Sequence, residues 1–226
     1  MIAELLQAQK NADILFKEAE DRGYIAAGMT EKDLNTKIFR LAEELFGIKK
    51  YWHKRIVRSG PNTLLPYREN PPDLGLQTDD ILFFDFGPVF EEWEADYGRT
   101  YVIGNDPAKL RLKKDVEEAW YAGQRYFREN YKEITGAGFY AFTKELAGKM
   151  GWEFGNIHCG HLIGNFPHEQ IQGEEVRNYI HPDNPDRMAE PDLEGRKRYW
   201  IYEIHLVDRA KKIGGFFEQL VSFDDL

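Results

Sequence analysis

Apolar positions recur at the helical period in the first fifth of the chain. Between residues 2 and 22 they are spaced closely enough to that period to predict a helix. A second helix is marked more clearly. Thr30 is a good N-cap residue, the apolar positions between 34 and 45 fall on one face, and Gly47 suits a C-terminal cap. The sequence therefore predicts two consecutive helices before residue 48.

Shorter apolar runs with the character of strands follow these helices. The run "DILFFDFG" at 80–87 is typical of a buried strand, and "FEEWEADYGRTYVIG" at 90–104 alternates partially and predicts another. A long helix starts near Pro107, and a shorter one covers about 139 to 149. The last apolar runs, "WIYEIHLVD" and "GGFFEQLVSF", predict two strands.

The same order of elements thus occurs twice, without a repeat in the sequence itself. Each half has a long helix, a shorter helix and then strands, which predicts an α+β domain of two similar halves over residues 1–226. We expect the functional site to lie between the two halves. The polar segment 173–198 has no clear period and is expected to be an insertion or a lid loop.

Composition narrows the class of protein. An apolar fraction of 42% with 14% aromatic residues is typical of a folded domain. The formal charge of -9, from 30 basic and 39 acidic residues, disfavours nucleic acid and anionic membranes as partners. The single cysteine, Cys159, excludes an intramolecular disulfide. Without a signal peptide or a membrane-spanning run, the expected location is the cytoplasm.

Four carboxylates stand in apolar surroundings, where burial is costly unless they are paired or bind a metal. Asp85 ends an apolar run, Asp96 follows eleven positions later, and Glu203 and Glu218 lie inside the last two strands. An ion pair with Arg99 explains either aspartate alone, and a buried arginine or lysine explains each glutamate. One cation site, or a pair of ions about 3.5 to 4 Å apart, explains all four together with the histidine-rich stretch 158–169. The residues alone thus favour a two-metal hydrolase.

The order and local context of five of these residues resemble the pita-bread metallopeptidases. Asp85, Asp96, "GHLIG" around His161, Glu203 and Glu218 match that pattern, together with "PHE" at His168. The family includes methionine aminopeptidase, aminopeptidase P, prolidase and creatinase, and the resemblance covers roughly residues 50 to 223. It implies a pita-bread fold with the metal site between the halves.

The resemblance also implies roles. Asp85 would chelate one metal, Asp96 and Glu218 would bridge both, and His161 and Glu203 would hold the other. A hydroxide between the ions would attack the scissile carbonyl, with Glu203 as proton acceptor. The histidine at 168 would stabilise the tetrahedral intermediate. A carboxylate-rich site with one imidazole favours manganese or cobalt, while iron and zinc are also possible ions.

The substrate side of the site departs from the pattern. Pro66-Tyr67 stands where aminopeptidase P and prolidase have His-Tyr, so Tyr67, Arg68 or His53 are the candidates to take over that role. His205 shares a strand face with Glu203 and either approaches the site or supports a hydrogen-bond network further out. His158 has no family role. It is either a polar loop residue, which is the preferred interpretation, or a donor that supports a metal ligand from outside.

The function expected is therefore hydrolysis of short peptides at the N-terminal residue, with Xaa-Pro substrates favoured by the "VRSGPN" and "EIHLV" contexts. The chain lacks the N-terminal domain of the Xaa-Pro enzymes and in that respect resembles methionine aminopeptidase. One alternative is a hydrolase of a non-peptide amide C–N bond. The other is a binding protein without activity, which retention of all five ligands disfavours. A small peptide is the expected partner, and a homodimer is left open.

Overall fold

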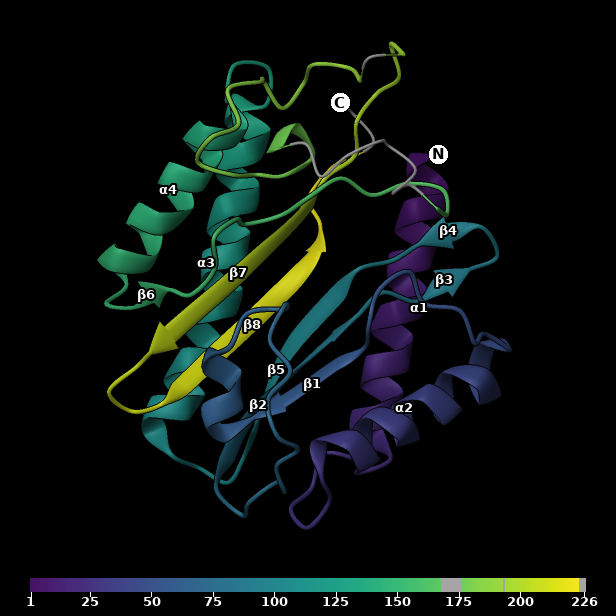
Figure 1. The fold of residues 1–226 in the computed structure, drawn as a ribbon, viewed down its shortest axis with the longest axis vertical. Helices are drawn as coiled ribbons and strands as arrows, with labels where there is room; N and C mark the ends of the chain where they lie inside the picture. Colours follow the sequence, from purple (N-terminus) through teal and green to yellow (C-terminus); the bar gives the residue numbers. More distant parts are fainter. Residues whose placement is uncertain (168–175, 193, 224–226) are drawn as a thin grey trace.

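A six-stranded antiparallel sheet forms the centre of the protein in the computed structural model, which describes residues 1–167, 176–192 and 194–223 (Figure 1). Its strand order is β1-β2-β5-β8-β7-β6. A small ribbon of two further strands, β3 and β4, lies outside it. The bounds are β1 Ile56–Ser59, β2 Asp80–Phe86, β3 Val89–Phe90, β4 Trp93–Glu94, β5 Tyr97–Ile103, β6 Glu153–Phe154, β7 Ile201–Asp208 and β8 Ile213–Leu220.

Four α-helices flank the sheet, and local sequence explains where they begin. Their bounds are α1 Ile2–Asp21, α2 Glu31–Phe46, α3 Pro107–Asn130 and α4 Gly136–Lys149. The start of α2 is a capping box between Thr30 and Asp33, and its end is Gly47 in the left-handed conformation. Asp106 caps α3 by accepting from two backbone N–H groups. Within the described ranges, these helices are too short or too polar to cross a membrane.

The two expected halves are present. The first contains α1, α2, β1, β2 and β5, and the second contains α3, α4, β6, β7 and β8. Each half has a core of its own, around Phe16 and Phe84 in the first and around Trp120 and Phe139 in the second. The halves join where β5 pairs with β8, in the middle of the sheet.

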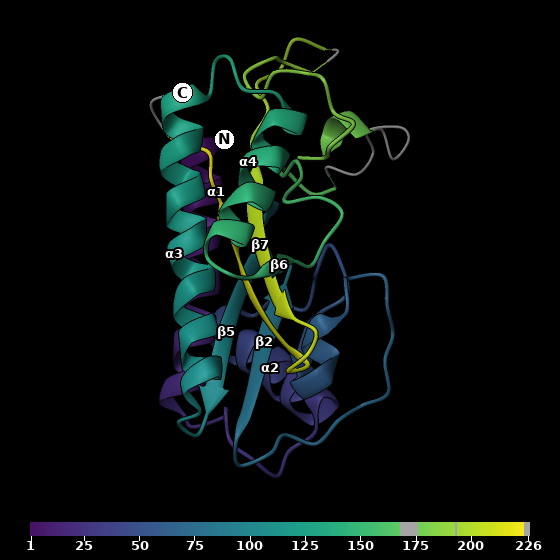
Figure 2. The ribbon, with the colours of Figure 1, turned by 90° about the vertical axis from the view of Figure 1, so that its left-hand side faces the viewer.

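The two faces of the sheet have different environments. Figure 2 shows α1 and α3 along one side of the strands and the long loops on the other. On β7, Tyr202 belongs to the core under α3 and α4, and its carbonyl accepts from Trp120 Nε1 at 2.8 Å. Gly123 of α3 permits this approach, because a Cβ there would overlap the Tyr202 ring. The alternate residues Glu203 and His205 therefore point to the loop side.

The structure differs from the expected elements in three places. The segment 90–104 is not one strand: it turns at Glu91, whose φ is 57°, and β5 starts only at Tyr97. Strands β1 and β6, of four and two residues, are too short to give a periodic signal. Helix α4 begins at Gly136 rather than near 139, because the Thr135 hydroxyl accepts from the Gly138 N–H at 3.0 Å.

The polar segment expected at 173–198 packs onto the second half where it is described. It contains the short 3₁₀ helix η3 Val176–Asn178. Ile180 and Met188 are fully buried in the core of α3 and α4. The buried Asn184 side chain donates to the carbonyl of Tyr179 at 2.7 Å. These contacts fix the described part of the segment to the domain.

Candidate metal centre

Three of the predicted carboxylate ligands lie in one row across the sheet. Asp85 of β2 is opposite Gly98 of β5, Gly98 is opposite Glu218 of β8, and Glu218 is opposite Glu203 of β7. Residues directly opposite each other in neighbouring strands project from the same face of a sheet. The register alone therefore brings Asp85, Glu218 and Glu203 to the loop side of the sheet, from both halves of the molecule.

Gly98 leaves space in the middle of this row. A Cβ at that position would lie 2.6 Å from the Phe216 ring and 3.0 Å from Cβ of Glu218, so a side chain does not fit there. Asp96 precedes Gly98 by two positions and extends toward the same face. Its carboxylate reaches the space between Asp85 and Glu218 and contacts histidines on both of its oxygens.

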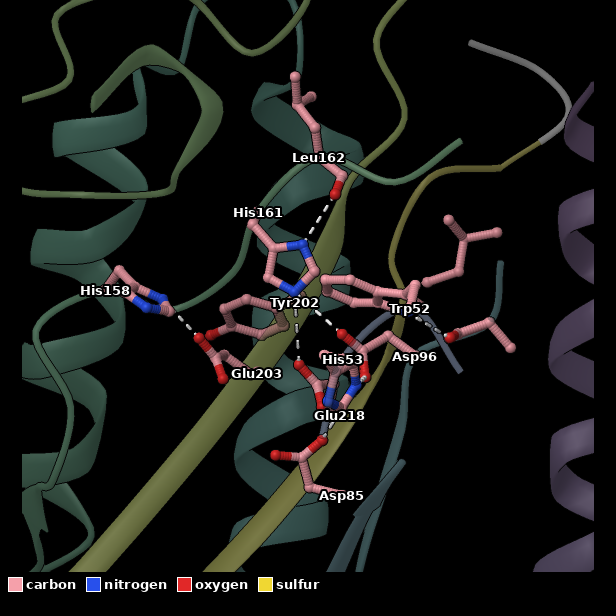
Figure 3. A network of polar contacts seen from close by, with 12 residues as sticks. Trp52, His53, Asp85, Asp96, His158, His161, Leu162, Tyr202, Glu203 and Glu218 are labelled. Carbon is pink, nitrogen blue, oxygen red and sulfur yellow. Dashed lines mark hydrogen bonds and ion pairs between the residues drawn. The ribbon is translucent and has the colours of Figure 1, made fainter. Parts of the chain in front are cut away.

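The loop that carries His161 runs beside β7 through backbone hydrogen bonds. The N–H groups of Ile201 and Glu203 donate to the carbonyls of His161 and Cys159, at 2.8 and 3.1 Å. Gly160 makes this approach possible, because a Cβ there would overlap the Ile201 carbonyl. As Figure 3 shows, His161 Nε2 consequently lies 3.0 Å from Asp96 Oδ2, and it is 3.9 Å from an oxygen of Glu218.

His53 enters the same cluster from the loop before β1. Its Nε2 lies 3.1 Å from Asp96 Oδ1 and 3.6 Å from Asp85 Oδ1. The sequence made it a candidate for substrate contact, and the structure places it among the predicted metal ligands. Its separation from Asp96 by 43 positions gives no local signal of this contact.

His158 is closer to the site than the preferred interpretation of a polar loop residue implied. Its Nδ1 lies 2.5 Å from Oε1 of Glu203 (Figure 3), and its ring packs against Tyr179 at 5.1 Å. The structure therefore favours the other alternative, in which His158 supports a predicted metal ligand. Cys159 beside it is fully buried.

Burial and close charges shift the pKa values of the cluster. Burial raises the pKa of Asp85 to about 7 and that of Glu218 well above its ordinary value. Burial opposes ionisation of Asp96 too, but His53 and His161 outweigh it and hold its pKa well below the usual range. His53 in turn has its pKa raised to about 9, because Asp96 and Asp85 outweigh the effect of burial.

The donor atoms of this cluster fit a divalent cation. Two groups of donor atoms lie within 4.8 Å of one another, one formed by His53, Asp85 and Asp96 and the other by Asp96, His161 and Glu218. Oε2 of Glu218 is buried without a hydrogen-bond partner in the described structure, a costly state that a cation relieves. Asp96 is common to both groups and offers a donor atom to each.

The remaining predicted residues lie around a small pocket beside this cluster. Tyr67 and His205 line it, and His205 is held by the contact of its Nε2 with the carbonyl of Thr63 at 2.8 Å. Pro66, which replaces the family histidine, also lines the pocket. His168 lies outside the described residues.

Arg58 is a pocket residue that the sequence analysis missed. The residue is only 3% exposed, and its Nη2 donates to the carbonyls of Pro66 and Glu69 at 3.0 and 2.9 Å. Its Nη1 is buried and has no hydrogen-bond partner among the described residues. A basic residue between the apolar and small residues of "RIVRSG" was the available signal, because burial of an arginine requires a partner.

Known proteins share part of this sequence and its fold. The chain is 25% identical over 175 residues to an Xaa-Pro dipeptidase of Pyrococcus horikoshii, covering 73% of this chain and 48% of that protein. It is 26% identical over 179 residues to an Xaa-Pro dipeptidase of Lactobacillus helveticus, covering 77% and 47%. The chain thus spans about half the length of the curated relatives it matches.

Solved structures share the fold. An X-Pro aminopeptidase of Thermotoga maritima superposes with a TM-score of 0.74 at 22% identity, over 96% of this chain and 56% of that one. A prolidase of Thermococcus sibiricus gives 0.71 at 21% identity, over 96% and 55%. The pita-bread fold expected from the resemblance is confirmed. The model of metallopeptidase family M24 matches residues 3–193, and the chain belongs to that family.

Proposed function

We propose that the protein is a two-metal-dependent peptidase that removes the N-terminal residue of short peptides and prefers proline after the scissile bond. The observation that carries the proposal is the row of three buried carboxylates with Asp96 and two imidazoles beside it. The preference for proline rests on the curated relatives, which include Xaa-Pro dipeptidases and putative Xaa-Pro aminopeptidases at 24–26% identity.

The residues present fit the metal pair that the family implies. In this proposal Asp85 would hold one ion, His161 and Glu203 would hold the other, and Asp96 and Glu218 would serve both. Carboxylate and imidazole donors suit manganese, cobalt, iron and zinc, of which a set with a single imidazole favours the first two. Such ions lower the pKa of a bound water to near neutrality and polarise the substrate carbonyl.

The chain's own residues would move the proton and hold the substrate. Glu203 accepts the proton of the attacking water, and His158, 2.5 Å from Oε1 of Glu203, orients that carboxylate. His168 donates to the oxygen of the tetrahedral intermediate, as the resemblance implies. Tyr67, His205 and His53 are proposed substrate contacts because the first two line the pocket beside Asp85 and the third lies next to it.

The experiment is hydrolysis of a matched peptide set by manganese- or cobalt-loaded protein. The set contains Xaa-Pro dipeptides, Xaa-Pro tripeptides and Met-Ala peptides, each with and without chelator. Chelator-sensitive cleavage of the Xaa-Pro peptides is the expected result. Cleavage of only the Met-Ala peptides would contradict the proline preference and leave the peptidase chemistry in place.

A hydrolase of a non-peptide amide bond is the second candidate. It is favoured by Pro66, which brings no polar side chain to the pocket, and by the fixed polar segment after residue 176. Protein with two bound ions that cleaves none of the peptides would support this candidate over the first. Protein that binds no divalent ion would contradict both.

A further inference from the structure

We propose that His53 is itself a metal ligand, so that each ion of the pair is bound by one imidazole. This inference rests on the proposed function, since it extends the five-residue ligand set of that proposal to six. It replaces the substrate role of His53 with a direct bond to the ion that Asp85 holds. Its support comes from the positions of His53 relative to Asp85, Asp96 and His161.

The two histidines are placed symmetrically about Asp96. His161 Nε2 is 3.0 Å from one carboxylate oxygen of Asp96, and His53 Nε2 is 3.1 Å from the other. Two donor atoms at 2.0–2.2 Å from one ion, at a right angle to each other, are about 3 Å apart. His53 therefore has the same spacing from Asp96 as the histidine that the resemblance assigns to the metal.

Backbone contacts orient both imidazoles in the same way. Nδ1 of His53 lies 2.7 Å from the carbonyl of Lys54, and Nδ1 of His161 lies 2.7 Å from the carbonyl of Leu162. A carbonyl accepts but cannot donate, so each Nδ1 carries the hydrogen. With Nδ1 protonated in this way, Nε2 is the ring nitrogen left to bind an ion beside the carboxylate oxygens. Metal-ligating histidines commonly donate their other N–H in this manner.

The ring of His53 is also fixed by packing. Trp52 holds the loop, because its backbone N–H and its Nε1 donate to the carbonyls of Gly87 and Ala95, both at 2.9 Å. Gly87 lies directly against the imidazole, where a Cβ would overlap the ring. The His53 side chain is only 6% exposed. A ligand held this firmly is preorganised for an ion rather than available to follow a substrate.

A second imidazole changes the expected metal preference. Manganese and cobalt were favoured on the basis of a carboxylate-rich site with one imidazole, whereas imidazole donors suit zinc and iron better. With His53 as well as His161 bound to the pair, the preference moves toward these ions. Cobalt(II) is the probe used here, since it binds mixed carboxylate and imidazole donors and shifts nearby proton resonances strongly.

The test uses the full chain, stripped with chelator and reloaded with cobalt(II). Proton NMR in water detects the exchangeable Nδ1–H of each coordinated imidazole as a separate, strongly shifted signal. Wild type should give two such signals, and His53→Ala and His161→Ala should each lose a different one. His181→Ala, a histidine in the described part of the polar segment, is the matched control and should keep both.

Metal titration supplies the second readout. Wild type should bind two cobalt ions per chain, and His53→Ala should bind one of them at least about tenfold more weakly. His53→Gln distinguishes metal ligation from a hydrogen-bonding role. An amide can still donate to Asp96 but does not replace the imidazole as a ligand. A hydrogen-bonding role alone predicts that His53→Gln keeps both affinities, and this result would overturn the proposal.

The outcomes also separate this inference from the proposed function. Wild type that binds two ions but gives a single shifted imidazole signal, assigned to His161 by its variant, contradicts only the role of His53. Wild type that binds no cobalt contradicts the proposed function itself. A single shifted signal in wild type contradicts two coordinated imidazoles, so that outcome decides against the proposal even where a substitution disturbs folding.

Discussion

At the scale of single residues, the site is defined by charged groups that the fold buries without full compensation. Glu218 is 2% exposed and Arg58 is 3% exposed, and each has a side-chain atom without a hydrogen-bond partner in the described structure. Such groups cost stability unless a ligand completes them. Cations would compensate the buried carboxylates, and an anion would compensate the guanidinium. A carboxylate and the guanidinium line the same pocket, since Asp85 and Arg58 both belong to it.

Glu203→Gln removes the proposed proton acceptor with little change in shape. We expect kcat for an Xaa-Pro dipeptide to fall by about 10²-fold or more. The melting temperature of the metal-free protein should not fall, because the substitution removes one of several neighbouring buried carboxylates that repel one another. Steady-state kinetics and thermal unfolding measure the two quantities. Turnover within a factor of two or three of wild type would exclude the role of Glu203 as base.

Arg58→Met tests whether the unpartnered guanidinium binds the carboxylate of a dipeptide. A hydrogen bond to a charged group contributes about 1.5–3 kcal/mol, so KM for an Xaa-Pro dipeptide should rise by roughly tenfold or more. The same dipeptide with an amidated C-terminus is the control, and its KM should be nearly unchanged. An equal rise for both substrates would indicate that Arg58 only holds the loop at Pro66 and Glu69.

At the scale of elements, strand register decides the site more than any single motif. Asp85, Gly98, Glu218 and Glu203 come from four consecutive strands of the sheet and are aligned in one row. A shift of one residue in any of these pairings would turn a ligand to the opposite, helix-covered face. The buried aromatic residues of that face, such as Tyr202, oppose this shift because they would move into the site.

Gly98→Ala should disturb this row. The new methyl group would lie 2.6 Å from the Phe216 ring and 3.0 Å from Cβ of Glu218, so the Glu218 side chain must move. We expect the affinity for cobalt or manganese to fall at least about tenfold, measured by calorimetric titration. Gly148→Ala in α4 is the matched control, because nothing lies within 4 Å of its Cβ position. Unchanged affinity in Gly98→Ala would show that the row tolerates a side chain.

At the scale of the whole molecule, the candidate metal centre joins two halves with separate cores. Asp85 and Asp96 belong to the first half, and His161, Glu203 and Glu218 belong to the second. Ions bound between them would connect the two cores in addition to the β5–β8 pairing. Metal binding is therefore expected to stabilise the entire domain and not only the loops at the site.

Removal of metal should consequently lower the melting temperature of the protein. A ligand present at 100 times its Kd adds about 2.7 kcal/mol of stability, which corresponds to roughly 5–10 °C for a domain of this size. Thermal unfolding with and without chelator measures this shift. The Glu218→Gln variant is the control, because it lacks a proposed shared ligand and should show a smaller shift. Equal melting temperatures for wild type with and without metal would contradict the role of the ions in joining the halves.

Local sequence patterns were sufficient to predict the helices, most of the longer strands and the candidate ligands. Helical period and caps such as Thr30 and Gly47 act within a few residues, so they are readable locally. Carboxylates within apolar strands stand out for the same reason, and their order carried the resemblance. The break of the segment 90–104 at Glu91 was missed, because its partial alternation continues through the turn.

The way in which these residues meet depends on contacts between elements that are distant in the sequence. Gly98 and Glu218 are 120 positions apart, and their pairing depends on the joining of two independently packed halves. The contacts of His53 with Asp96 and of His158 with Glu203 span 43 and 45 positions, and no local pattern encodes them. Local periodicity reports which face of an element is buried. Which elements share that face is set by long-range packing, and the second imidazole beside Asp96 became visible only there.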